Sequence, residues 1–229
     1  MVIDQAGFDD GVYMKHNVNM KLMVLASAVF SMVGVYGTPV SPSSTVVLVD
    51  LHGVLFELSW KRALCTGIKN VFKIMKNIRR LKKEHPKMSF KDRCKESGQV
   101  PANCQIPQER VWRMIRTLKR QGYPVYLFSN ILPETFDGLR KKFPDLFKLF
   151  DGCITPQYSN NLMNKSHDGF FKHAEQLLAK DGHGGKRIYL FDDTPANVAK
   201  AHAHRWHGTV VTSPDQCVQV VRRLGFPLA

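Results

Sequence analysis

Cysteine is scarce in this chain, and its five cysteines lack any spacing that would hold a metal ion. There is no Cys-x-x-Cys pair and no histidine paired with a nearby cysteine, so a zinc site is not expected. Cys94 and Cys104 flank a loop that contains Gly and Pro, and they are candidates for a disulfide in an oxidising compartment. The alternative is that all five are small buried or partly exposed thiols.

A long hydrophobic run is also lacking, because the uncharged stretch 22–37 is short for a membrane span. A basic segment, residues 15–21, precedes it, and this order is typical of a signal peptide. Residues 1–43 are therefore predicted to be a signal or anchor segment with its linker, and the protein to be exported or membrane-anchored. Three aspartates among residues 1–13 count against a signal, and a buried N-terminal helix in a cytoplasmic protein is the alternative.

Acidic residues are outnumbered: 19 Asp and Glu stand against 33 Lys and Arg, which gives a net charge of +14. The excess gathers in residues 61–96, which hold thirteen Lys and Arg against three Asp and Glu. Such a balance permits nucleic acid, anionic lipid or a small phosphorylated or anionic substrate as the partner, and by itself it does not choose among them. Nucleic acid is not expected, because no aromatic stacking pattern interrupts the basic run, and a solvated helix face explains it more simply.

The apolar pattern indicates a globular α/β domain, with 44% hydrophobic residues overall. Four short apolar runs predict buried strands at 46–49, 125–128, 188–191 and 209–211. Helices are expected at 108–121, 136–143, 168–180, 196–204 and 214–224. Buried strands that alternate with helices predict a Rossmann-like, three-layer fold, in which helices cover both faces of a parallel sheet.

The connection between the first two predicted strands is too long for a simple crossover. Residues 55–95 carry apolar side chains at three- and four-residue steps and predict helix, and residues 97–107 predict a loop. We therefore expect a core domain of residues 44–56 and 106–229, with a small helical cap, residues 57–105, inserted after the first strand.

The end of the first predicted strand is the most informative point in the sequence. Residues 46–55 are Val-Val-Leu-Val-Asp-Leu-His-Gly-Val-Leu, so an apolar strand brings Asp50 to its carboxyl end and Gly53 allows a tight turn. The carboxyl ends of the strands are where an open α/β sheet places its chemistry.

Three further polar sites follow strands or loops at the same predicted edge: Ser129, Lys165 and the pair Asp192-Asp193. A carboxylate can attack phosphorus and form an aspartyl phosphate. A hydroxyl can orient phosphoryl oxygens, and a lysine can neutralise charge on the nucleophile and the transferring group. Two carboxylates from different strands form an oxygen-ligand site suited to Mg²⁺.

Four segments in this order resemble the four motifs of the haloacid dehalogenase (HAD) superfamily. Residues 50–53, Asp-Leu-His-Gly, are similar to the first motif, Asp-x-Asp-Gly, with His52 in place of the second aspartate. Residues 125–130 resemble the second motif, an apolar strand that ends in Ser or Thr. Residues 165–168, Lys-Ser-His-Asp, resemble the third, Lys-Pro-Asp-Pro, without its prolines. Residues 191–198, Phe-Asp-Asp-Thr-Pro-Ala-Asn-Val, resemble the fourth.

The resemblance spans residues 45–225 and implies the HAD fold, in the subfamily with a small helical cap. The implied catalytic residues are the nucleophile Asp50, the general acid/base His52, the phosphate-orienting Ser129 and the charge-neutralising Lys165. The implied substrate-binding residues are Ser129, Asn130 and Lys165. The implied cofactor is Mg²⁺, with Asp50, His52 through its carbonyl, Asp193 and Asp192 as ligands and Asn197 in support. Trp60, Lys61 and Arg62 are expected where the chain enters the cap, facing the site.

His52 leaves the function open. A histidine can protonate a leaving group and then activate water, so one prediction is a magnesium-dependent phosphomonoesterase that forms an aspartyl phosphate on Asp50. Another is a non-catalytic HAD-fold module that binds a phosphorylated ligand or partner through its basic cap. A third outcome is another activity, because dehalogenases and phosphonatases of the superfamily also lack the second aspartate. Dehalogenases need no magnesium, and the intact pair Asp192-Asp193 argues against that one.

Overall fold

The computed structural model describes residues 40–59, 76–77, 79–86, 102–131, 133–156 and 164–228. All of them belong to one compact unit, Pro39–Ala229. The predicted signal segment, most of the predicted cap, Cys94 and Trp60–Arg62 lie outside the described residues, so what was expected of them stays a prediction. Within these described ranges no helix is both long enough and apolar enough to cross a membrane.

A five-stranded sheet, in the order β5-β4-β1-β6-β7, forms the middle layer of this unit, and all its neighbouring strands are parallel. The strands are β1 (Thr45–Val49), β4 (Val125–Phe128), β5 (Gly152–Ile154), β6 (Arg187–Asp192) and β7 (His207–Val210). In the central strand β1, Val49 stands opposite Leu127 of β4 and Phe191 of β6. The predicted parallel α/β sheet is confirmed. The edge strand β5 was missed, because three residues are too few to show a period.

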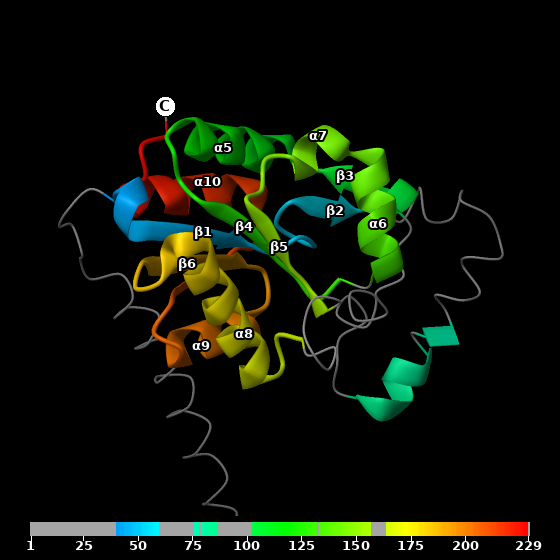
Figure 1. The fold of residues 1–229 in the computed structure, drawn as a ribbon. Coiled ribbons are helices and arrows are strands. Elements are labelled where there is room, and N and C mark those ends of the chain that lie inside the picture. The colour runs from blue at the N-terminus through cyan, green and yellow to red at the C-terminus, as the bar shows by residue number, and fades with distance from the viewer. Residues whose placement is uncertain are drawn as a thin grey trace, which may run out of the picture. The chain divides into compact units, whose positions relative to one another are not determined.

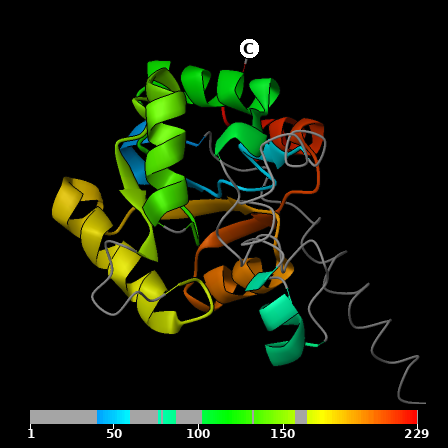
Figure 2. The same cartoon turned by 90° about the vertical axis from the view of Figure 1, so that its right-hand side faces the viewer.

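Helices cover both faces of the sheet (Figures 1 and 2). They are α5 (Glu109–Arg120), α6 (Pro133–Lys142), α7 (Pro144–Phe147), α8 (Asp168–Leu178), α9 (Pro195–Ala203) and α10 (Pro214–Arg223). Val47 and Val49 of β1 belong to a core with α5 and α10, whereas Val46 and Leu48 pack with α8 and α9. Strand β1 is buried along its whole length because successive side chains point to opposite, covered faces.

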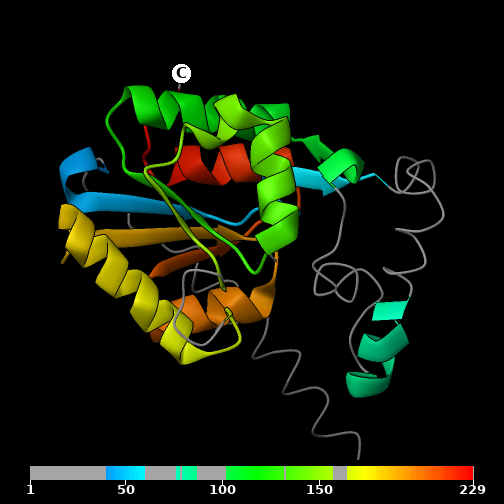
Figure 3. The same ribbon diagram turned by 45° about the vertical axis from the view of Figure 1, so that its right-hand side comes forward.

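A second, two-stranded sheet corrects the secondary structure predicted around the cap. β2 (Phe56–Leu58) pairs antiparallel with β3 (Gln105–Pro107), and Figure 3 shows this pair apart from the main sheet. The helix predicted to start at Leu55 is therefore wrong there, and so is the loop predicted to run through Pro107. The two strands lie nearly fifty residues apart, so no local pattern reveals their pairing. Residues 76–77 and 79–84 are helical, as predicted for that stretch.

The β2–β3 pair is joined to the core by its aromatic and backbone contacts. Phe56 packs edge-on against Trp112 of α5, with ring centroids 5.5 Å apart. The buried indole N–H of Trp112 donates to the Leu55 carbonyl at 3.0 Å, and the Gln108 N–H donates to the same carbonyl at 2.8 Å. The predicted junctions between core and cap, after residues 56 and 105, fall within these two strands.

Candidate active site

Neighbouring strands bring three carboxylates together at the carboxyl edge of the sheet. The chain passes from β1 to β4 and β5 on one side, and β6 and β7 lie on the other, so β1 marks the switch point where open α/β sheets bind ligands. Asp50 follows β1 directly, and its N–H donates to the Phe191 carbonyl of β6 at 2.9 Å. One ligand oxygen from each of Asp50, Asp192 and Asp193 lies within 4.8 Å of the others.

Lys165 is buried among these carboxylates, with 1% of its side chain exposed. Its ammonium donates to Asp50 Oδ1 at 2.7 Å and to Asp192 Oδ2 at 2.6 Å, and it lies 4.9 Å from the centre of the Phe128 ring. Burial by itself lowers the pKa of this ammonium, but Asp192 and Asp50 outweigh it, so the pKa of Lys165 is raised. The lysine therefore stays charged at neutral pH.

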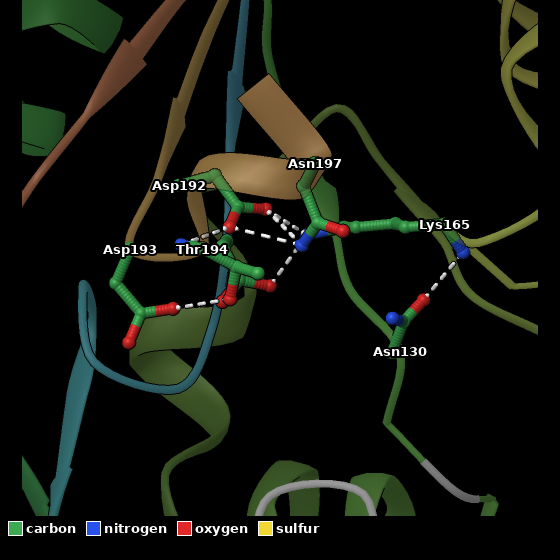
Figure 4. Close-up of polar contacts among 7 residues, drawn as sticks. Asn130, Lys165, Asp192, Asp193, Thr194 and Asn197 are labelled. Carbon is green, nitrogen blue, oxygen red and sulfur yellow. Dashed lines mark hydrogen bonds and ion pairs between the residues drawn. The ribbon is translucent and has the colours of Figure 1, made fainter. Parts of the chain in front are cut away.

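Asp192 and Asp193 are adjacent in sequence but stand in different surroundings (Figure 4). Asp192 is fully buried, and its carboxylate accepts from the Thr194 N–H at 2.8 Å and from Asn197 Nδ2 at 3.0 and 3.1 Å, besides Lys165. Asp193 is half-buried and accepts from the Thr194 hydroxyl at 3.2 Å. Protein donors thus occupy both oxygens of Asp192, and Asp193 is better suited to ligate a metal ion.

The turn after Asp50 needs glycine at position 53 for two reasons. Gly53 has φ +83°, in the left-handed region, and a Cβ built there would lie 2.1 Å from Asp193 Oδ2. The Gly53 N–H donates to the Phe56 carbonyl at 2.8 Å, which leads the chain straight into β2. His52 is half-buried in this turn and forms a backbone bridge with Phe56. The turn therefore places Gly53 against Asp193, a metal-ligand candidate, and holds the backbone of His52 beside Phe56.

The remaining predicted site residues follow β4. Ser129 is buried, and its N–H donates to the Ile154 carbonyl at 3.1 Å. Asn130 accepts through Oδ1 from the backbone N–H of Lys165 at 2.7 Å. Asn164, which sequence reasoning missed, accepts from both the N–H and the hydroxyl of Ser166, at 2.8 and 2.6 Å. The triplet Asn-Lys-Ser was the available signal, since Asn commonly bonds the backbone two residues on.

The donor set fits a magnesium ion. Mg²⁺ takes octahedral oxygen ligands at about 2.0–2.1 Å, which places pairs of ligand oxygens about 3–4 Å apart. One carboxylate oxygen from each of the three aspartates lies within 4.8 Å of the others, a somewhat wider spacing. Three carboxylates against the single ammonium of Lys165 also leave two negative charges, which a divalent cation balances. Asp50 and Asp193 would hold the ion, with Asp192 behind them.

No protein-family model matches the sequence, and no curated protein matches it, but solved structures do. A HAD family enzyme from Bacteroides thetaiotaomicron, in its magnesium complex, is 18% identical with a TM-score of 0.54, covering 79% of this chain and 99% of its own. An L-2-haloacid dehalogenase from Xanthobacter autotrophicus, with chloropropionic acid covalently bound, is 13% identical at TM-score 0.51, covering 79% and 82%. A further dehalogenase is 13% identical at TM-score 0.52, covering 75% and 86%.

At these identities the likeness establishes the fold. The chain has the HAD-like α/β fold, with its parallel sheet and a cluster of acidic residues and one lysine at the carboxyl edge. Of the predicted site residues, the structure brings Asp50, Lys165, Asp192 and Asp193 into one cluster, with Asn197 bonded to it.

Proposed function

We propose that this protein is a magnesium-dependent phosphomonoesterase that forms an aspartyl phosphate on Asp50. The observation that carries the proposal is the Asp50–Lys165–Asp192 chain of buried ion pairs, with Asp193 beside it. Buried charges are costly, and a network of them at the ligand-binding edge of a sheet is typical of a catalytic site. Its net negative charge suits a divalent cation, and Lys165 together with that cation would attract a phosphate group.

In the first step Asp50 attacks the phosphorus atom. Lys165 donates to Oδ1 of Asp50 and so neutralises part of the charge on the attacking carboxylate. As the new P–O bond forms, the bond from phosphorus to the ester oxygen breaks, and the leaving oxygen takes a proton from His52. Ser129 orients the phosphoryl oxygens. Asp50 and Asp193 would hold Mg²⁺, which would supply positive charge to the transferring group.

In the second step water releases phosphate. His52, now neutral, accepts a proton from water as the water oxygen attacks phosphorus. The P–O bond to Asp50 breaks, the carboxylate returns to its pairing with Lys165, and inorganic phosphate leaves. His52 ends the cycle protonated, ready for the next leaving group.

A substrate panel tests the proposal directly. Purified protein is assayed with phosphomonoesters and with 2-haloacids, in excess Mg²⁺ and in excess chelator. We expect phosphate release that needs Mg²⁺, that Asp50→Asn abolishes, and that the surface variant Asp168→Asn retains. Turnover of a 2-haloacid without Mg²⁺ would instead place the protein with the dehalogenases that share its fold. Phosphate release by Asp50→Asn at the wild-type rate would refute the covalent mechanism.

The second candidate is a non-catalytic module that binds a phosphorylated ligand or partner through its basic cap, and His52 is what favours it. A His52→Ala and His52→Asp series separates the two functions. For an enzyme we expect His52→Ala to lower the rate about 10²–10⁴-fold, and the pH–rate profile to differ between wild type and His52→Asp. If the wild-type protein is inactive and only the His52→Asp variant hydrolyses phosphomonoesters, the natural protein is a non-catalytic relative.

We also propose that the segment before residue 40 exports the protein or anchors it in a membrane. The basic segment 15–21 and the uncharged stretch 22–37 support this. Cell fractionation with N-terminal sequencing of the mature protein tests it. A cytoplasmic protein that keeps residues 22–37 would refute the proposal.

A further inference from the structure

Lys165 must be positioned with unusual accuracy for a residue outside any helix or strand. Its ammonium makes two short ion pairs, to carboxylates from two different strands, while only 1% of the side chain is exposed. A lysine side chain has several rotatable bonds and loses much conformational entropy when it is held. The backbone that carries it lies in a turn before α8, so something other than a regular element must hold its Cα in place.

Asn130 makes a direct contact with that backbone. Its Oδ1 accepts from the Lys165 N–H at 2.7 Å, across 35 residues of chain (Figure 4). Asn130 is itself held, because it follows Ser129, whose N–H is bonded to the Ile154 carbonyl of β5. From this geometry we propose that Asn130 is a positioning residue for Lys165, which ties the lysine's backbone to the end of β4.

Asn164 holds the backbone that follows Lys165. Its side chain accepts from both the N–H and the hydroxyl of Ser166, and its own carbonyl accepts from the His167 N–H at 2.9 Å. Residues 166–168 contain no proline to restrict the backbone. The hydrogen bonds of the Asn164 side chain restrict it instead. Asn130 and Asn164 thus fix the backbone on both sides of the lysine.

This role differs from direct recognition of the substrate. A substrate-binding asparagine would act on phosphate through its NH₂ donors, whereas the contact seen here uses its oxygen acceptor. Aspartate keeps an acceptor but has no donor, and leucine has the shape of asparagine without either. The pair Asn130→Asp and Asn130→Leu therefore separates positioning from substrate binding.

Amide hydrogen exchange of the full-length protein, read by NMR, tests the contact without any assay of activity. We expect Asn130→Leu to speed exchange of the Lys165 amide about fivefold or more, and Asn130→Asp to keep it protected. The Phe170 amide, bonded to the His167 carbonyl at 3.1 Å, is the internal control and should not change in either variant. An unchanged Lys165 amide in Asn130→Leu would overturn the proposal.

The kinetic test rests on the proposed phosphatase function. We expect Asn130→Leu to lower kcat about 10²-fold with little change in KM, as a displaced lysine would, and Asn130→Asp to recover most of the loss. Asn164→Ala should lower kcat in the same way and raise exchange of the Ser166 amide. A large rise in KM with unchanged kcat in both Asn130 variants would make Asn130 a substrate ligand and overturn the proposal. If wild type is inert on every phosphomonoester, the proposed function fails, and the exchange measurement still decides the role of Asn130.

Discussion

The two ends of the sheet bury polar groups in opposite ways. At the carboxyl end, the buried polar side chains of Asp50, Lys165 and Asp192 are charged and hold one another. At the amino end the buried hydroxyl of Tyr123 is neutral and donates to the Val40 carbonyl. Burial, and to a smaller extent the nearby Tyr189, raise the pKa of Tyr123, so that the hydroxyl keeps its proton. A buried ion pair adds little net stability, because desolvating its charges costs much of what the pairing gains. A neutral hydrogen bond has a smaller desolvation cost and a modest net gain. The difference indicates that the carboxyl end is shaped for chemistry and the amino end for stability.

The largest effect is expected from Lys165→Met, because it leaves two buried carboxylates without their cation. We expect a loss of about 3–5 kcal/mol in the free energy of unfolding, measured by urea denaturation, together with loss of the proposed phosphatase activity. Lys200→Met is the matched control, since Lys200 pairs with Asp168 at the same 2.6 Å, but Asp168 is 70% exposed and Lys200 is 34% exposed. Exposed pairs contribute little, so this variant should stay active and nearly as stable as wild type. Equal losses in both variants would remove the contrast between buried and exposed pairs.

A smaller effect is expected from Gly53→Ala, which probes how closely the turn approaches Asp193. Its left-handed φ costs about 1–2 kcal/mol for any L side chain, and the new Cβ must also displace Asp193. Gly122 has nearly the same φ, +82°, but nothing lies within 4 Å of a Cβ there. Gly53→Ala should therefore weaken Mg²⁺ binding, measured by calorimetry, and destabilise the protein more than Gly122→Ala does. Identical Mg²⁺ affinity in both variants would show that Asp193 does not depend on the glycine.

Tyr123→Phe tests the amino end and should act on stability alone. The variant keeps the ring, which packs on Phe226 with centroids 5.2 Å apart, and removes only the hydroxyl that donates to Val40. We expect a loss of about 1 kcal/mol in the free energy of unfolding, with unchanged turnover. A change in kcat would mean that the two ends of the sheet are coupled, contrary to the comparison drawn above.

The smallest effect concerns His207, which begins β7 at the amino end and stacks on Tyr189 with centroids 4.8 Å apart. Although His207 is exposed, partial loss of water around its ring, then the charges of Arg187 and His202, lower the pKa of His207 below its ordinary 6.5. The unfolded chain therefore binds more protons between the two pKa values, so stability is lost as pH falls from 6.5 toward the folded pKa. NMR titration should find the lowered pKa, and His207→Gln should flatten the pH dependence of unfolding slightly. A folded pKa at or above 6.5 would contradict this.

Prediction from sequence worked best for strands that can be recognised from their own residues alone. The buried strands ending at Asp50, Ser129 and Asp192 were found because continuous apolar runs end in polar residues, whatever the rest of the chain does. It failed for β2 and β3, because Phe56–Leu58 is a strand only through its pairing with Gln105–Pro107. It also missed β5, a three-residue edge strand that includes a glycine.

The site divides along the same line. The residue types and their order along the chain were enough to predict a nucleophile, a lysine and a pair of aspartates at one edge, because parallel strands must end together there. Sequence alone did not show that Lys165 would join Asp50 to Asp192, or that Asn130 would hold its backbone, because these contacts join residues that lie 27 to 115 positions apart. It also did not separate the roles of Asp192, the last residue of β6, and Asp193, which lies in the bend after it, because only the folded chain gives the two side chains different neighbours.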